Sequence, residues 1–134
     1  MTTIITYGTF DLFHLGHLNI LRRARALGSR LVVGVSDDAF NEVKGKRCTY
    51  PYADRAEIVA AIRYVDHVFP ESSWDQKRRD ITDQRADVFV MGDDWRGRFD
   101  DLSDICEVHN LARTPDISTT SIKRGLASSD EGAG

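Results

Sequence analysis

Two histidines stand three residues apart near the amino terminus, directly after a short apolar run. The segment reads Tyr7-Gly8-Thr9-Phe10-Asp11-Leu12-Phe13-His14-Leu15-Gly16-His17, and we predict that a strand ends in it and a helix begins. A helix start offers backbone N–H groups and the positive end of the helix dipole, which favour an anionic phosphate. Because residues three apart share a helix face, both imidazoles can donate hydrogen bonds to a phosphate during phosphoryl or nucleotidyl transfer.

Two other interpretations of the histidine pair stay open. A zinc site would need a third ligand, but His67 and His109 fall in separate predicted strands without ligand-like neighbours. The two histidines could also lie on a helix surface by chance. Gly8 and Gly16 favour the phosphate interpretation, because glycines let a backbone approach a phosphate closely.

A second helix start with hydroxyl groups is predicted late in the chain. Ser118, Thr119 and Thr120 precede Ile122, so their hydroxyl and N–H groups can face an anion. Arg113 can add a charge-assisted contact to phosphate or ribose. The alternative is that Ser118 is only a helix cap.

A short basic cluster, Lys44-Gly45-Lys46-Arg47, follows the second predicted strand. Taken alone, such a run is most often a solvated loop. Asp94 follows another predicted strand, where its carboxylate could accept from the exocyclic amine of cytosine; the alternative is a solvated acidic turn.

The elements that must position these residues alternate between β-rich runs and helical stretches. Such alternation indicates an α/β fold, here a single doubly wound, Rossmann-like domain whose mainly parallel sheet has about five strands. Ligands of such sheets lie at the carboxyl ends of the strands, and each motif above follows a predicted strand end. The expected strands are residues 4–7, 31–35, 65–69, 88–91 and a weaker 107–111.

Three helices are predicted between these strands. The first carries Leu18, Leu21 and Ala24 on one face and stops at Gly28. The second starts at a capping box of Asp54 and Glu57, and the third at one of Ser73 and Gln76. The apolar face expected for the second helix is Ile58, Ile62 and Val65, and the third is expected to run through Ile81 towards Arg85.

The composition limits the classes of function. The chain has 134 residues and a net charge of -3, so we expect no nucleic-acid binding through a basic field. No apolar run approaches the roughly 20 residues that span a bilayer, and no signal peptide is evident, so we expect a cytoplasmic protein with Cys48 and Cys106 as reduced thiols. We expect one domain over residues 1–126 and a flexible tail over 127–134.

The element His14-Leu15-Gly16-His17 resembles the signature of the nucleotidyltransferase superfamily, which includes cytidylyltransferases and several adenylyltransferases. Further segments narrow the resemblance to the bacterial cytidylyltransferases that act on glycerol 3-phosphate, over roughly residues 3–125. One departure is Asp116, where that family has glycine, in a turn that aspartate adopts less readily. These segments are Arg63-Tyr64-Val65-Asp66, Val90-Met91-Gly92-Asp93-Asp94-Trp95 and Arg113-Thr114-Pro115-Asp116-Ile117-Ser118-Thr119-Thr120-Ser121-Ile122-Lys123.

The resemblance implies transfer of CMP from CTP to sn-glycerol 3-phosphate, with Mg²⁺ bound to CTP, in a homodimer that serves the synthesis of cell-wall or capsule polymers. It implies catalytic roles for Asp11, His14, His17, Lys44, Lys46 and Arg113. The implied contacts to CTP come from Gly8, Thr9, Phe10, His14, His17, Gly92, Asp94, Arg113, Thr114, Ser118 and Thr119. Those to the acceptor come from Lys44, Lys46, Arg55, Trp74 and Lys77, while Arg63 and Asp66 organise the site or a subunit contact.

Several rival functions stay open at this point. Trp74 could be a core residue. It is also the one aromatic residue evident beside Lys77. A quaternary-ammonium acceptor would need a cage of several aromatic rings, so the sequence favours an anionic or neutral polar acceptor. An adenylyltransferase, a cytidylyltransferase for another alcohol phosphate and a non-catalytic nucleotide-binding module are the alternatives, while the absent G-x-x-x-x-G-K-[ST] pattern argues against a P-loop enzyme.

Overall fold

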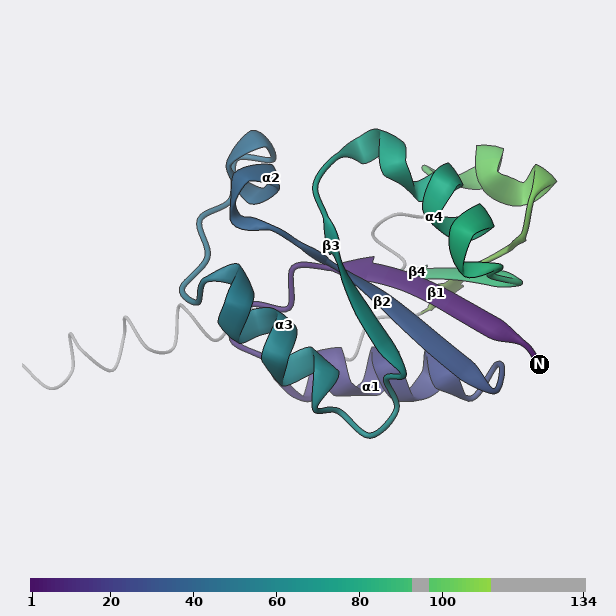
Figure 1. Ribbon diagram of the computed structural model, residues 1–134, viewed down its shortest axis with the longest axis horizontal. Coiled ribbons are helices and arrows are strands. Elements are labelled where there is room, and N and C mark those ends of the chain that lie inside the picture. The colour runs from purple at the N-terminus through teal and green to yellow at the C-terminus, as the bar shows by residue number, and fades with distance from the viewer. Residues whose placement is uncertain (93–96, 112–134) are drawn as a thin grey trace, which may run out of the picture.

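The computed structural model describes residues 1–92 and 97–111, which form one sheet with helices on both faces (Figure 1). All of its strand pairs are parallel, and their order in the sheet is β3-β2-β1-β4-β5. The chain therefore winds outward from β1 in one direction and then returns to the other side of β1. The predicted doubly wound α/β fold is confirmed, with strands β1 (Thr3–Gly8), β2 (Arg30–Ser36), β3 (His67–Glu71), β4 (Val88–Gly92) and β5 (Glu107–Leu111).

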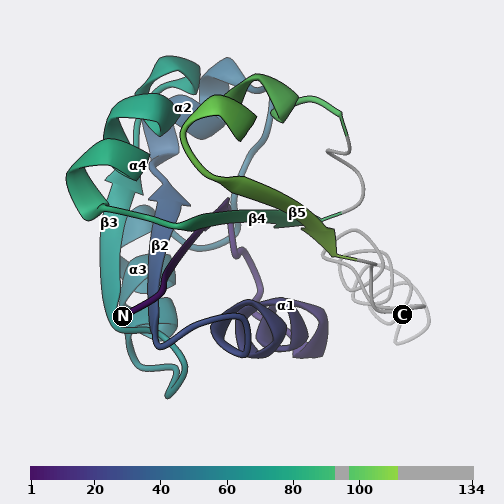
Figure 2. The ribbon, with the colours of Figure 1, turned by 90° about the vertical axis from the view of Figure 1, so that its right-hand side faces the viewer.

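The helices cover the two faces of the sheet in separate layers. Figure 2 shows α1 (Leu15–Arg25) and α3 (Tyr52–Ala60) below the sheet, with α4 (Lys77–Gln84) and the 3-10 helix η3 (Asp100–Asp104) above it. The short helix α2 (Asp38–Val43) and the 3-10 turn η1 (Trp74–Gln76) follow the carboxyl ends of β2 and β3.

Each face of the sheet has its own apolar core, because successive strand residues point to opposite sides. In β1, Ile4 packs towards Leu21 of α1, whereas Ile5 and Tyr7 pack towards Ile81 of α4. Residues 3–7 are all buried, as expected for a central strand of a parallel sheet. The edge strand β3 instead exposes His67 and Pro70, and an edge position tolerates a proline.

The second predicted helix was placed too late along the chain. Helix α3 begins at Tyr52 after Pro51, and Asp54 makes no capping contact but lies in the first turn. Ile58 is exposed at 37%, and the helix ends at Ala60. Ile62 and Val65, the other apolar residues of the predicted face, pack against the core from the turns that follow the helix. Strand β3 starts at His67, two residues later than predicted.

Gly28 does not stop the first helix, which ends at Arg25. Its role is steric, because a Cβ at Gly28 would lie 2.5 Å from the Thr2 carbonyl oxygen. The third predicted start is confirmed, since the Gln76 side chain accepts from the Ser73 N–H at 3.1 Å. Helix α4 follows that turn and ends at a left-handed Arg85 (φ 53°).

Helix α2 was not predicted, because six residues are too few for a clear apolar period. None of the helices in residues 1–92 and 97–111 has the length and apolar character that crossing a bilayer requires. The predictions for Asp94, the segment 113–123 and the tail 127–134 fall outside the described residues.

Candidate active site

His14 and His17 cap the start of α1 together. His14 is the residue before the helix, and its Nδ1 accepts from the Gly16 N–H at 3.0 Å. The Nδ1 of His17 accepts from the His14 N–H at 3.2 Å. The two rings stack with centroids 3.8 Å apart. The prediction that both imidazoles lie on one side of a helix start is confirmed, although His14 is the cap and not part of the first turn.

The capping contacts fix the tautomer of both rings. Because each Nδ1 accepts a hydrogen bond, the proton of each neutral imidazole sits on Nε2, which is then a donor. Among the described residues, the Nε2 of His14 is buried and has no hydrogen-bond partner. Buried polar atoms in native proteins are normally paired, so this N–H is suited to an oxygen of a ligand.

Both rings are held neutral by their surroundings. Burial lowers the pKa of His14. Burial, reinforced by the neighbouring His14, lowers the pKa of His17 to about 4, with Asp11 acting weakly in the opposite direction. At neutral pH the pair therefore contributes N–H donors and the field of the helix, while positive charge must come from lysine or arginine.

The loop between β1 and α1 has an unusual backbone. Phe10 and Leu12 adopt positive φ values of 55° and 49°, a conformation that costs energy in residues with a side chain and is found at functional sites. The Phe10 ring is buried against His17, with centroids 5.4 Å apart. A Cβ at Gly8 would lie 2.8 Å from that ring. The predicted CTP contact of Phe10 can therefore come from its backbone, and Gly8 is needed for packing.

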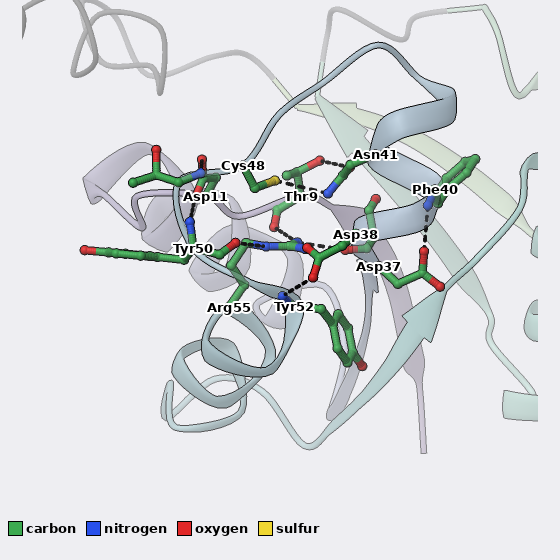
Figure 3. Close-up of polar contacts among 12 residues, drawn as sticks. Thr9, Asp11, Asp37, Asp38, Phe40, Asn41, Cys48, Tyr50, Tyr52 and Arg55 are labelled. Atoms are coloured by element: carbon green, nitrogen blue, oxygen red, sulfur yellow. Dashed lines mark hydrogen bonds and ion pairs between the residues drawn. The ribbon is translucent and has the colours of Figure 1, made fainter.

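Asp11 holds a second loop against this one. Its carboxylate is 3% exposed and accepts from the N–H groups of Thr49 (2.7 Å) and Tyr50 (3.0 Å), as Figure 3 shows. The basic cluster ends two residues before Thr49. The structure thus gives Asp11 a positioning role, since it joins the histidine segment to the end of the lysine loop.

Arg55 is not available to bind an acceptor, which corrects the prediction. Its side chain is 0% exposed and donates to the carbonyls of Tyr50 (3.0 Å), Thr9 (2.8 Å) and Ser36 (2.7 Å), and to the Asp38 carboxylate (2.7 Å) (Figure 3). These groups belong to the loop after β1, the end of β2, α2 and the loop before α3. Arg55 is the structural centre that holds them together.

Thr9 is linked to α2 beside this centre. Its hydroxyl donates to Asn41 Oδ1 at 3.3 Å, and the Asn41 amide donates to Cys48 Sγ at 3.1 Å (Figure 3). Helix α2 is capped by Asp37, which accepts from the Phe40 N–H at 2.7 Å. The loop of the basic cluster is therefore anchored at several points close to the histidine segment.

Two of the predicted acceptor lysines lie in a connected buried network. Lys44 Nζ donates to Ser36 Oγ at 2.9 Å, and Ser36 Oγ donates to Glu71 Oε1 at 2.9 Å. The other oxygen of Glu71 pairs with Lys77. Burial lowers the pKa of Lys44 to about 8. Lys46 is exposed, so it is the more accessible of the two lysines in the basic cluster.

Trp74 lies at the centre of a group of aromatic rings and cations. It is 38% exposed, which argues against a core role, and its ring centroid is 5.1 Å from that of Phe40. Lys77 Nζ lies 5.3 Å from the Trp74 centroid but is itself only 4% exposed. The Arg98 guanidinium carbon lies 5.1 Å from the same ring.

Gly92, at the carboxyl end of β4, has open space beside it. A Cβ placed there would meet no atom of residues 1–92 and 97–111 within 4 Å. The sheet order reverses between β1 and β4, which is where ligands bind in such folds. The histidine pair follows β1, and Gly92 ends β4. The remaining predicted CTP contacts, Asp94, Arg113, Thr114, Ser118 and Thr119, fall outside the described residues.

Arg63 and Asp66 lie away from this edge of the sheet. The Asp66 carboxylate accepts from the Leu31 N–H at 2.8 Å and pairs with Arg25 Nε at 3.4 Å, near the amino-terminal end of β2. Arg63 lines a shallow hollow with Tyr64 and residues 22, 25 and 26 at the end of α1. A role in organising the site directly is therefore not supported, and the role at a subunit contact stays a prediction.

Sequence reasoning missed the polar residues that support the site, namely Ser36, Asp37, Asp38, Asn41, Glu71 and Arg98. The one available signal was position, because Ser36 ends β2, Asp37 follows it directly and Glu71 ends β3. Within the described ranges, no group of three histidine, cysteine or acidic side chains could hold a metal ion.

The fold and the helix-capping histidine pair at its switch point define a nucleotidyltransferase. Residues 5–125 match the model of the cytidylyltransferase-like family, and the chain belongs to that family. It is 55% identical over 127 residues to glycerol-3-phosphate cytidylyltransferase of Bacillus subtilis (strain 168), covering 95% of this chain and 98% of that protein.

Two further comparisons agree with this placement. The enzyme of the same name from Staphylococcus aureus (strain NCTC 8325 / PS 47) is 52% identical over 130 residues, covering 97% of this chain and 98% of that one. A lipopolysaccharide core biosynthesis protein from Thermoplasma volcanium GSS1 has the same fold, with a TM-score of 0.77 at 22% identity, covering 85% of this chain and 98% of that one.

Proposed function

We propose that the protein transfers CMP from CTP to sn-glycerol 3-phosphate, giving CDP-glycerol and pyrophosphate. The observation that carries the proposal is the buried Nε2 of His14, which has no hydrogen-bond partner among residues 1–92 and 97–111. It lies at a helix start that follows β1, a strand at the switch point of the sheet. The near full-length identity to two enzymes named for glycerol 3-phosphate supports this choice of acceptor.

The reaction needs no general base. An ionised phosphate oxygen of the acceptor forms a new bond to the α-phosphorus of CTP, and the bond from that phosphorus to the bridging oxygen of pyrophosphate breaks. Catalysis then reduces to positioning and stabilisation of charge on the phosphoryl oxygens. The Nε2–H groups of His14 and His17 would donate to the oxygens of the α-phosphate, in the direction fixed by their capping contacts.

Positive charge for the phosphates would come from the basic loop. Lys44 and Lys46 lie on either side of Gly45, whose φ of 74° turns the chain between them. Arg113 would add a contact to the polyphosphate, as the sequence predicts. We place the acceptor between this loop and Trp74.

The surroundings of Trp74 favour an anionic acceptor. Aromatic rings do gather there, but they already face cations of the protein: Lys77 faces the rings of Tyr7 and Phe99 at 4.7 and 5.1 Å, and Lys44 faces the ring of Phe40 at 4.6 Å. A quaternary ammonium would be repelled by these charges, whereas a phosphate is attracted.

Mg²⁺ is expected to enter with CTP, because phosphate oxygens are its usual ligands. The described residues do not supply a metal site of their own: they hold no cluster of three suitable side chains, and the oxygens of Asp11 accept from backbone N–H groups.

A homodimer with Arg63 near the contact, a cytoplasmic location and a role in cell-wall or capsule polymer synthesis remain proposals that follow from the family. The hollow beside Arg63 lies at the end of α1, away from the histidine pair, where a subunit contact would leave the site open. Sedimentation of the purified protein would test the homodimer.

The activity is tested by pyrophosphate release from CTP and, separately, from ATP, with Mg²⁺ and a panel of acceptors. The panel holds glycerol 3-phosphate, phosphoethanolamine, phosphocholine and polyol phosphates. Release confined to CTP with glycerol 3-phosphate, with CDP-glycerol identified by mass, is the expected result. Release with another acceptor would keep the chemistry and overturn the acceptor, and no release with any pair would favour a non-catalytic nucleotide-binding module.

A further inference from the structure

A single buried carboxylate connects the two lysines on the acceptor side of the site. Glu71 ends β3 and is 3% exposed. One of its oxygens pairs with Lys77, and the other accepts from the Ser36 hydroxyl at 2.9 Å. That hydroxyl accepts in turn from Lys44 Nζ at 2.9 Å. The order of the contacts is therefore ammonium, carboxylate, hydroxyl, ammonium.

The charges of this network do not cancel. A buried charge is costly unless it is paired, and Lys77, 4% exposed beneath Trp74, is the direct partner of Glu71. Lys44 makes its contact to the hydroxyl of Ser36 and not to the carboxylate. The network holds two ammonium groups and one carboxylate, so the positive charge of Lys44 is not neutralised.

The network also sets the position of that ammonium. Lys44 is the cap residue directly after α2, and a lysine side chain is flexible unless something holds it. Ser36 is 0% exposed and is held by the second oxygen of Glu71. The backbone carbonyl of Glu71 accepts from the Asp37 N–H at 2.9 Å, so the strand end and the start of α2 are joined at the same point.

We propose that Glu71 is a positioning residue for the acceptor phosphate. Through Ser36 it holds Lys44 where that ammonium meets the acceptor, and through Lys77 it supports the wall formed by Trp74. Glu71 itself contacts no substrate. The inference rests on the proposed function, because it assumes that an alcohol phosphate binds beside Lys44.

The titration of Lys44 separates this role from a merely structural one. The groups that face Lys44 are Glu71 of β3, Lys77 of α4, and Lys46 and Cys48 from the loop after α2. Burial holds the pKa of Lys44 at about 8, and Glu71 opposes this effect by raising it. Loss of the carboxylate charge should therefore lower that pKa further, and Lys44 should lose its charge at a lower pH.

The test compares Glu71→Gln and Ser36→Ala with the wild type, and uses Glu57→Gln on the exposed side of α3 as the matched control. Initial rates from roughly pH 6 to 10 give KM for glycerol 3-phosphate and for CTP separately. We expect Glu71→Gln to raise KM for glycerol 3-phosphate about tenfold, as loss of one contact to a charged group does. KM for CTP should stay nearly unchanged. The alkaline limb of kcat/KM for the acceptor should move to lower pH, and the control should match the wild type.

Ser36→Ala keeps the Glu71–Lys77 pair and removes only the link to Lys44. The Ser36→Ala variant should have a raised KM for the acceptor and a thermal midpoint close to that of the wild type. If Glu71→Gln fails to fold, Ser36→Ala tests the inference in its place. Two results would overturn the inference. One is a folded Glu71→Gln protein in which both the KM for the acceptor and the alkaline limb are unchanged, and the other is an unchanged acceptor KM in Ser36→Ala.

A measurement on the free protein keeps this inference distinguishable from the proposed function. Lysines can be dimethylated with ¹³C, and the Lys44 signal, assigned with Lys44→Arg, can be followed through a pH titration by NMR. A wild type that forms no CDP-glycerol refutes the proposed function. A Lys44 titration that is the same with and without the Glu71 carboxylate refutes the inference about Glu71.

Discussion

The imidazole rings of His14 and His17 stack at a centroid separation of 3.8 Å and an interplanar angle of 21°, each tied by Nδ1 to a backbone N–H of the same helix start. Two N–H groups that a bare helix start would offer to a phosphate are therefore used by the rings. The rings in turn present their Nε2–H groups. An anion at this helix start would therefore meet the Nε2–H groups of the rings in place of those two backbone N–H groups. These donors lie one imidazole width further out, and their direction is fixed by the capping contacts.

Replacing His14 by asparagine should separate its two roles. The asparagine side chain still caps a helix well but has no group at the position of Nε2. We expect kcat to fall about 10²- to 10³-fold, as for loss of a transition-state donor, while the thermal midpoint stays near that of the wild type. His14→Ala should lose the same activity and, in addition, about 1 kcal/mol of stability with the cap. A folded His14→Asn protein with near-normal kcat would contradict the proposed role.

The depressed pKa of His17 predicts how stability depends on pH. The unfolded histidine titrates near its ordinary value of 6.5, whereas burial holds the folded pKa at about 4. Between these values the unfolded state binds more protons, so stability is full above pH 6.5 and is lost as the pH falls towards 4. Thermal midpoints measured across this range should fall with pH in the wild type and fall less in His17→Gln.

The exposed His67 supplies the control for this prediction. His67→Gln removes an imidazole from β3 and should leave the acid loss of stability as it is in the wild type. If His17→Gln and the wild type lose stability in parallel, the acid sensitivity belongs to other groups.

The fold and the histidine motif were predictable because both depend on residues that are close together in the sequence. Apolar runs and their turn signals gave β4 and β5 almost to the residue. Position after a strand end marked His14 and His17 as candidate site residues. The capping exchange between the two rings was not predictable, because histidine is not among the usual cap residues.

The supporting residues could not be predicted because their roles depend on contacts between distant segments. Arg55 gave the same signal as any exposed basic residue, yet it is buried, since four backbone and side-chain oxygens from four other segments surround its guanidinium. Glu71 resembled the end of an ordinary edge strand, but Lys77 and Ser36 meet its carboxylate there. The spacing of residues within one helix or strand does not predict contacts with other segments.

Arg55 should therefore matter for stability before it matters for substrate affinity. Arg55→Met leaves the oxygens of Thr9, Ser36, Tyr50 and Asp38 without their donor, and breaking a buried charge network of this kind costs about 3–5 kcal/mol. Urea unfolding should report this loss. Glu57→Gln on the same helix is the control: its side chain is exposed, so the change should cost less than about 0.5 kcal/mol. A stable Arg55→Met protein with a raised KM for the acceptor would restore the direct binding role.

Gly92 offers a test of where CTP lies that does not depend on removing a functional group. A Cβ at Gly92 would meet no atom of the described part of the chain within 4 Å, so Gly92→Ala should change the free energy of unfolding by less than about 0.5 kcal/mol. If the nucleotide packs against the end of β4, the added methyl group should weaken CTP binding by about 1–3 kcal/mol, the usual cost of overpacking. Calorimetric titration with CTP measures this directly.

Gly8→Ala gives the opposite pattern and completes the comparison. Its Cβ would lie 2.8 Å from the Phe10 ring, so the folded protein itself must shift, and we expect a loss of stability of about 1–3 kcal/mol even without ligand. Weakened CTP binding in a fully stable Gly92→Ala protein then means that the methyl group meets the nucleotide and not the protein. Normal CTP affinity in that variant would instead move the nucleotide away from the end of β4, leaving the loop between β1 and α1 as its remaining described contact.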